Sequence, residues 1–137
     1  LCQKPVRELE ALRKDEIVLE HGETEIHGGA FDLVAAREVA GDIPVCICFN
    51  QELQITYGHG VVSMEFLNNT GSDRTIRKAK LDGLQNVRIL MDVSLVEIYF
   101  NDGELVMTTR YYPEDPMTTN VSISGMEQVK GWTMSGQ

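Results

Sequence analysis

The sequence has no apolar run that approaches the ~20 residues needed to cross a bilayer, and its first residues do not resemble a signal peptide. We therefore expect a soluble protein and no membrane partner. Positive charge is also scarce, because 12 Lys and Arg stand against 21 Asp and Glu, for a net charge of −9. This excess of negative charge argues against nucleic acid as a partner. With 137 residues the chain fits one domain that can bury a real core.

Cysteine and histidine are too few, and too poorly spaced, for a disulfide framework or a metal site. The cysteines are odd in number, and they are Cys2, Cys46 and Cys48. Cys46 and Cys48 lie two residues apart in an apolar run, so on a strand they share a face and are best explained as small buried hydrophobes. No pair of histidines has a spacing that brings it to those thiols. We therefore expect no metal ion and no cofactor.

The chain is organised around residues 87–113, its longest run of β-branched and aromatic residues, which is interrupted at Asn101, Asp102 and Gly103. An Asp-Gly step between alternating apolar residues is a strong hairpin signal, because Gly, and Asp more easily than most residues, tolerates the positive φ of a type I′ turn. The sequence therefore predicts a β-hairpin with Asp102 and Gly103 as its two loop residues.

The register of this hairpin follows by counting outward from the turn. One face carries the pairs Phe100–Leu105, Ile98–Met107 and Val96–Thr109, and the other carries Tyr99–Val106, Glu97–Thr108 and Leu95–Arg110. The first face is mainly apolar, so burial selects this register over a one-residue slip. Glu97 and Arg110 are diagonal neighbours, close enough for long side chains to meet and stabilise the sheet.

Short strands separated by turns are expected in most of the remaining chain. They lie near residues 17–19, 31–36, 45–49, 53–57, 62–66, 75–81, 121–123 and 132–134. The runs at 53–57 and 62–66 are expected to pair, and the basic run at 75–81 is expected at a sheet edge, where its charges oppose aggregation. This pattern predicts an all-β fold, an antiparallel β-sandwich of two sheets.

The first residues have a helical pattern instead. Val6, Leu9 and Leu12 recur at helical spacing, acidic residues come early, and basic residues such as Arg13 come last. They predict a short helix from Pro5 to Lys14. At under three turns it must rest on something larger to be stable.

Two segments resemble a known family. The run from Arg88 to Glu104 matches Asp-x-Ser-x-(Val/Ile)-Glu-(Val/Ile)-Phe-x-Asn-(Asp/Gly)-Gly-Glu, and residues 3–13 match Gln-x-Pro-(Val)-x-Glu-Leu-x-x-Leu-Arg. The first resembles the C-terminal domain signature of glycoside hydrolase family 32, the invertase and sucrose-6-phosphate hydrolase group. The second resembles the segment that joins that domain to the catalytic propeller. The resemblance implies a linker with a short helix at residues 1–15 and a β-sandwich domain at residues 16–137.

The resemblance also implies that this piece has no catalytic residue. The family motifs Trp-Met-Asn-Asp-Pro-Asn-Gly, Arg-Asp-Pro and Glu-Cys belong to the propeller, and none occurs in this sequence. Asp92 and Glu97 are therefore expected to be structural or domain-interface groups, with Asp92 holding the bend between two strands and Glu97 pairing across the sheet. A structural or domain-interface role is expected also for Val6, Leu9, Leu12, Arg13 and Arg110.

The leading hypothesis is thus a non-catalytic accessory domain that braces the N-terminal β-propeller of the same chain, with a homodimer contact as a further role. By the resemblance, the parent enzyme hydrolyses a β-fructosidic bond in sucrose or sucrose 6-phosphate. Because the sequence starts at Leu1 and enters a linker-like motif almost at once, we expect a fragment of a longer chain. Its compartment stays open, with the cytoplasm favoured.

The alternative is a carbohydrate-binding module, since lectin-like sandwiches bind sugars by stacking them on aromatic rings. The candidates for stacking are Tyr57, Tyr99 and Trp132. Aromatic residues make up only 7% of the sequence, so most of them are expected in the core. A free-standing interaction domain is a third hypothesis.

Overall fold

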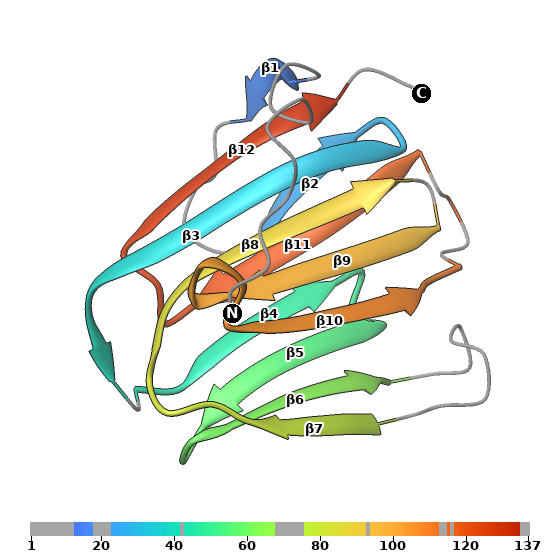
Figure 1. The fold of residues 1–137 in the computed structure, drawn as a ribbon. Coiled ribbons are helices and arrows are strands. Elements are labelled where there is room, and N and C mark those ends of the chain that lie inside the picture. The colour runs from blue at the N-terminus through green and yellow to red at the C-terminus, as the bar shows by residue number, and fades with distance from the viewer. Residues whose placement is uncertain are drawn as a thin grey trace.

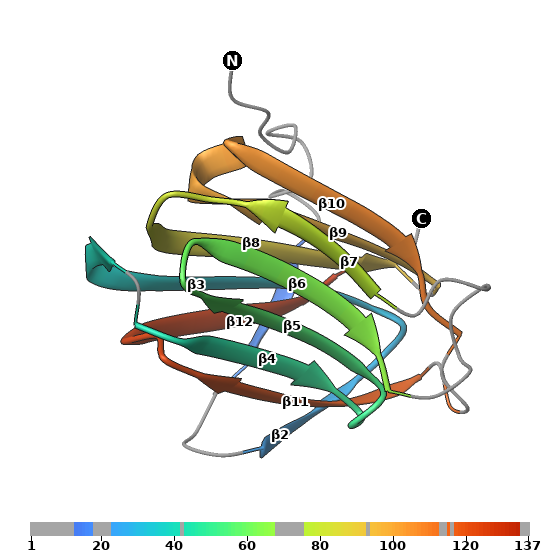
Figure 2. The same ribbon diagram turned by 90° about the horizontal axis from the view of Figure 1, so that it is seen from below.

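The computed structural model describes residues 13–17, 23–41, 43–67, 76–92, 94–112, 115 and 117–134. In these ranges twelve strands form two antiparallel six-stranded sheets, which pack face to face as two layers (Figures 1 and 2). The predicted all-β sandwich is therefore confirmed.

We call the first layer sheet A; its strand order is β1-β12-β3-β8-β9-β10. The strands are β1 (Arg13–Ile17), β12 (Gln128–Met134), β3 (Ala30–Gly41), β8 (Leu84–Asp92), β9 (Leu95–Phe100) and β10 (Leu105–Arg110).

Sheet B has the order β2-β11-β4-β5-β6-β7. The strands are β2 (Glu23–His27), β11 (Thr118–Ser124), β4 (Val45–Phe49), β5 (Leu53–Gly58), β6 (Val61–Phe66) and β7 (Ile76–Lys80). The chain crosses repeatedly from one sheet to the other, so strands that are distant in sequence, such as β4 and β11, become neighbours.

The core lies between the sheets because residues along each strand point alternately inward and outward. In β4, Val45, Ile47 and Phe49 are buried, whereas the two cysteines between them are half-buried on the other face. Phe49 of sheet B meets Phe31 of sheet A with ring centroids 6.1 Å apart. Full burial of a Phe, Ile or Leu side chain contributes about 1.5–3 kcal/mol, so the apolar core between the sheets supplies most of the stability of the fold.

The central hairpin has the predicted register but a different turn. β9 and β10 pair Phe100 with Leu105 and continue in step to Leu95 with Arg110. The connection is a 3₁₀ turn over Asn101–Gly103, closed by a 3.3 Å bond from Glu104 N to Asn101 O. The two-residue loop predicted at Asp102 and Gly103 is therefore wrong: residues 101–104 all lie outside the strand pairing.

Contacts of the Asn101 side chain explain this longer loop. Its Nδ2 donates to Gly83 O at 2.8 Å, and its Oδ1 accepts from Gln85 N at 2.8 Å. These bonds tie the turn to the start of β8, in place of a cross-strand pair with Glu104.

The N-terminal helix is not supported where the structure describes it. Arg13 and Lys14 belong to β1, whose Arg13 pairs with Met134 of β12. Pairing with the open side of β12 satisfies backbone groups that a marginal helix would leave to water. The rest of the predicted helix, with Val6, Leu9 and Leu12, lies outside the described residues. Of the strand expected at residues 17–19, only Ile17 is described, and it ends β1.

The basic strand lies where it was predicted. Among the described strands β7 pairs with β6 alone, at the edge of sheet B, and it exposes Lys78 and Lys80. Arg77 of β7 donates from Nη2 to Thr108 O of β10 at 2.7 Å. Because β10 is an edge strand of sheet A, this bond links the two layers at one side of the sandwich.

Candidate functional site

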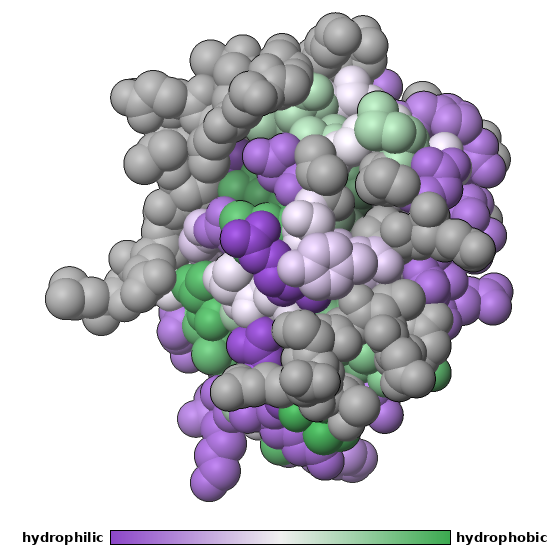
Figure 3. Space-filling view, turned by 90° about the vertical axis from the view of Figure 1, so that its right-hand side faces the viewer, coloured by the Kyte–Doolittle hydropathy of each residue, from purple (hydrophilic) through white to green (hydrophobic). Residues whose placement is uncertain are grey.

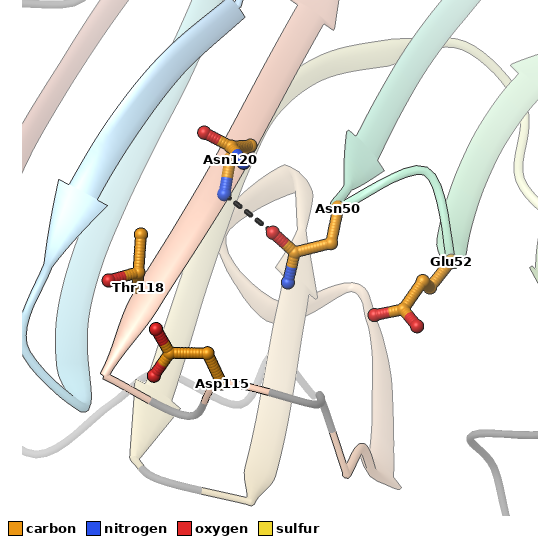
Figure 4. Close-up of a pocket in the computed structure, with 5 residues that line it drawn as sticks. All are labelled: Asn50, Glu52, Asp115, Thr118 and Asn120. Carbon is orange, nitrogen blue, oxygen red and sulfur yellow. Dashed lines mark hydrogen bonds between the residues drawn. The ribbon is translucent and has the colours of Figure 1, made fainter.

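A polar pocket of about 320 Å³ lies at one end of the sandwich, and Asn50, Glu52, Asp115, Thr118 and Asn120 line it. The residues come from the β4–β5 turn, the β10–β11 connection and β11 (Figure 4). Figure 3 shows this end of the molecule, where hydrophilic side chains gather near the middle of the described surface. The chemistry of the pocket depends on how each wall is held.

The β4–β5 turn supplies the first wall. Asn50 and Gln51 have positive φ angles of 55° and 56°, and Glu52 N donates to Phe49 O at 2.9 Å. A primed turn of this kind matches the twist of the flanking strands, and Asn tolerates its left-handed backbone well. Gln rarely adopts it, so Gln51 is a strained position that the turn maintains.

The hydroxyl group of Tyr111 holds both side chains of this wall. Tyr111 is 0% exposed. Its hydroxyl donates to Glu52 Oε1 at 2.5 Å and accepts from Asn50 Nδ2 at 2.9 Å. Burial raises the pKa of Tyr111, and the hydrogen bond to Glu52 raises it further. The neutral phenol thus remains a donor to Glu52 at all physiological pH values.

The second wall is β11, which two short bonds join to Asn50. Asn50 N donates to Asn120 O at 2.7 Å, and Asn120 N donates to Asn50 Oδ1 at 2.7 Å. Figure 4 shows Asn50 between Asn120 and Glu52. Asp115 is held by a 3.0 Å bond from Met117 N to its Oδ1. The pocket therefore combines two carboxylates, two carboxamides and a hydroxyl on a fixed frame.

Asp92, Glu97 and Arg110, the interface groups proposed from the sequence whose side chains the structure describes, do not line this pocket. Glu97 and Tyr99 lie on the face of sheet A that is turned away from sheet B, which we call the outer face. There Tyr99 Oη donates to Glu97 Oε2 at 2.7 Å. Burial, together with Glu97, raises the pKa of Tyr99 to about 12.

The expected contact between Glu97 and Arg110 does not form in the described part of the chain. Glu97 lies opposite Thr108, and its carboxylate takes the nearer Tyr99 hydroxyl. Arg110 is exposed at the end of β10. Asp92 is also exposed, at the end of β8, where it pairs with Ala30 and Leu95.

The three rings named as stacking candidates have different surroundings. Tyr57 is 2% exposed and belongs to the core, where its hydroxyl donates to Leu81 O at 2.9 Å and accepts from Gly83 N at 2.7 Å. The prediction that Tyr57 stacks on a sugar is therefore corrected, because its ring has no free face. Tyr99 and Trp132 are half-buried on the outer face of sheet A.

Sequence reasoning did not find the pocket. Asn50 and Glu52 lie far from Asp115, Thr118 and Asn120 in the sequence. Their meeting depends on the pairing of β4 with β11, whose register joins Phe49 to Val121. No local pattern encodes a contact of that sequence separation.

The fold defines the chain as an antiparallel β-sandwich domain, and comparisons with known proteins specify the class. Residues 50–133 match the family model described as "Glycosyl hydrolases family 32 C terminal". This chain belongs to that family. The matched part contains the central hairpin and all five residues that line the pocket.

Relatives and solved structures agree with this assignment. The chain is 29% identical over 147 residues to "Sucrose-6-phosphate hydrolase" of Vibrio alginolyticus, with 99% of this chain and 29% of that protein covered. A glycoside hydrolase family 32 structure from Bifidobacterium adolescentis has a TM-score of 0.77 at 16% identity, covering 98% of this chain and 24% of that one. The sucrose-6-phosphate hydrolase structure from Lactobacillus gasseri has a TM-score of 0.64 at 20% identity, covering 98% and 31%. The chain thus spans less than a third of these proteins.

Two further features concern the described residues alone. No helix there is both long and apolar enough to span a membrane. In the same residues, no three His, Cys, Asp or Glu side chains are grouped as metal ligands.

Proposed function

We propose that this chain is the non-catalytic accessory domain of a β-fructofuranosidase or sucrose-6-phosphate hydrolase, and that it braces the catalytic β-propeller of the same chain. The match of residues 50–133 to the C-terminal family model carries this proposal. The Vibrio alginolyticus relative supports it, because about 29% of that protein corresponds to this chain and the rest has room for a catalytic domain. A cytoplasmic location and a contact between two copies of the domain belong to the same proposal.

The outer face of sheet A is the surface that we assign to the catalytic domain. The register places an apolar set on this face, which consists of Val34, Leu90, Leu95, Tyr99, Val106 and Trp132. Leu90 is 9% exposed although it lies outside the cluster of side chains between the sheets. Outward-facing positions of a sandwich are usually polar, so an apolar set here fits an interface within a larger protein.

Several residues of the sequence prediction are placed in this proposal as interface or structural groups. Glu97 and Arg110 flank the apolar set on β9 and β10, and Asp92 ends the neighbouring β8. The N-terminal residues proposed to lead into the interface are Val6, Leu9, Leu12 and Arg13.

The surroundings of the two carboxylates in the pocket support a non-catalytic role. A glycosidase needs one carboxyl group as an acid and another as nucleophile or base, on opposite sides of the scissile bond. Glu52 accepts a bond from a buried tyrosine hydroxyl, and Asp115 is exposed and accepts from a backbone N–H. These contacts suit the binding of hydroxyl groups, and they do not provide the apolar surroundings that a glycosidase acid requires.

A matched pair of valine variants tests the bracing role in the full-length protein that contains this chain. Val106 and Val61 are both half-buried on outer faces, Val106 on sheet A and Val61 on sheet B. We expect Val106→Asp to shorten the half-life of sucrose-cleaving activity on heating several-fold, because it places a charge in the interface. Val61→Asp is the control and should leave that half-life within about twofold. Equal half-lives for the two variants would contradict the assignment of the outer face of sheet A to the catalytic domain.

Sugar binding by the outer face of sheet A is the second candidate function. Trp132 and Tyr99 both lie there, half-buried, with β3 and β8 between their strands. Titration of the 137-residue chain with fructans separates the two functions. A saturable change in Trp132 fluorescence would favour binding, and an unchanged spectrum leaves the face to the catalytic domain.

A further inference from the structure

The walls of the polar pocket are held in place without a ligand. Tyr111 is fully buried, and its hydroxyl group bonds both Asn50 and Glu52. A core that only needed to be filled would be served as well by phenylalanine, which has no hydroxyl to satisfy. The tyrosine therefore orients two of the lining side chains, and preorganised polar groups are what a small-molecule site requires.

The lining offers both donors and acceptors that the described part of the chain does not use. The Asn120 carboxamide and the Thr118 hydroxyl enter none of its side-chain hydrogen bonds, and Asn50 Nδ2 makes one of its two. Asp115 Oδ2 adds an acceptor beside Oδ1, which is bonded to Met117 N. A hydroxyl group both donates and accepts, so a ring with several hydroxyls matches this mixture.

The negative charge of the pocket restricts further the classes of ligand that it can bind. Glu52 and Asp115 are acidic, and no Lys, Arg or His is among the described residues that line the pocket. Phosphates and carboxylates are therefore repelled. A bare cation fits less well, because Ca²⁺ needs about 6–8 converging oxygen ligands, and here the Asn50 carboxamide, which carries a donor nitrogen, lies between Asn120 and Glu52 (Figure 4).

We propose that this pocket binds one ring of a neutral sugar. Asp115 and Glu52 accept bonds from sugar hydroxyls, and the amide groups of Asn50 and Asn120 donate to them. The volume of about 320 Å³ is at the lower limit of small-molecule sites, which suits a single hexose ring. This inference does not depend on the bracing role, since the pocket lies at the end of the sandwich and the bracing surface lies on the outer face of sheet A.

The test is a ¹H–¹⁵N NMR titration of the 137-residue chain with fructose and with glucose. Saturable shifts are expected in the side-chain amide signals of Asn50 and Asn120, with a dissociation constant on the order of 1 mM. Asn120→Ala removes a lining carboxamide and leaves the backbone bonds to Asn50, so it should weaken sugar binding about tenfold. The matched control is Asn86→Ala, since Asn86 contacts Asp102 at the opposite end of the sandwich. It should bind as the parent chain does, and thermal unfolding shows that both variants fold.

Separate titrations with inorganic phosphate and with calcium chloride complete the experiment. Neither should shift the Asn50 and Asn120 amide signals. The proposal is overturned if neither sugar shifts those signals at about 100-fold the expected constant. It is also overturned if calcium shifts them in place of sugar, or if Asn120→Ala binds sugar as tightly as the parent chain.

Discussion

Arg88 holds Asp32 through two hydrogen bonds on the outer face of sheet A, with Nε 3.1 Å from Oδ1 and Nη2 2.9 Å from Oδ2. Asp32 lies on β3 opposite Leu90, and Arg88 lies on β8 opposite Val34, so the two residues are diagonal neighbours. The Asp32 side chain is 0% exposed and that of Arg88 is 17% exposed. A two-point arginine–carboxylate contact is directional, and it opposes slippage between β3 and β8.

Arg88→Met should destabilise the fold by about 3–5 kcal/mol, because it removes a bidentate partner from a buried carboxylate. The double variant Asp32→Leu/Arg88→Met should lose less than Arg88→Met alone, since no buried charge is left behind. Urea unfolding at neutral pH measures both losses. A double variant that is less stable than the single one would show that the pair itself, and not the isolated charge, sets the cost.

Gly125, in the turn between β11 and β12, is expected to tolerate no side chain. A Cβ atom there would lie 2.3 Å from Pro44 O and 3.0 Å from Val45 Cα, and the backbone φ is +88°. Gly125→Ala should therefore cost about 3 kcal/mol or more, by combining backbone strain with a clash against main chain.

Gly58→Ala is the control for this substitution. A Cβ at Gly58 has nothing within 4 Å, and its φ is not in the left-handed range. The free energy of unfolding of Gly58→Ala should stay within about 0.5–1 kcal/mol of that of the parent chain. Thermal or urea unfolding of the two variants side by side gives the comparison, and similar losses would contradict the close approach to Pro44.

Two substitutions of Asn101 separate the stability that its side chain contributes from the strain of its left-handed backbone. Its φ is 51°, and its side chain bonds Gly83 O and Gln85 N. Asn101→Gly keeps the backbone conformation and should cost about 1–3 kcal/mol from the lost bonds. Asn101→Ala should cost about 1 kcal/mol more, because alanine is strained at this φ. Equal stabilities of the two variants by urea unfolding would contradict a strained turn.

Tyr111 should make the fold sensitive to alkaline pH. Its folded pKa is raised above the ordinary value of 10, so the folded state keeps the phenolic proton more tightly than the unfolded chain does. The resulting stability is complete below pH 10 and is lost as the pH rises through the folded pKa. Burial and Glu97 raise the pKa of Tyr99 to about 12, which adds to the loss in the same direction.

Unfolding free energies measured from pH 8 to pH 12 test this dependence. Tyr111→Phe should lower stability at pH 8 by about 1–2 kcal/mol, because Glu52 loses a donor, and it should reduce the fall above pH 10. A parent chain and a Tyr111→Phe variant with parallel pH profiles would contradict a contribution from this hydroxyl.

The extent to which the sequence predicts this fold differs from one element to the next. The pairing of β9 with β10 followed by counting, because burial of Ile98 and Phe100 permits only one register. The turn itself did not follow, because Asn101 is held by Gly83 and Gln85, which belong to another connection. Local propensity predicted the pairing of the strands, whereas a contact with another connection determines the conformation of the loop.

Features that join distant segments were missed for the same reason. Asp32 and Arg88 are separated by 56 positions, and Asn50 and Asn120 by 70. Each residue looks ordinary in its own strand or turn, and only the crossing of the chain between the two sheets brings them together. Arg13 and Lys14 show the converse, since a short helical pattern gave way to pairing with β12.

The most direct test of the account is the rate at which the purified 137-residue chain hydrolyses sucrose and sucrose 6-phosphate. We expect no turnover above a blank without protein, while the full-length protein that contains this chain cleaves at least one of the two substrates. Turnover by the 137-residue chain that Glu52→Gln or Asp115→Asn abolishes would contradict the account, because it would place reactive carboxyl groups inside the domain.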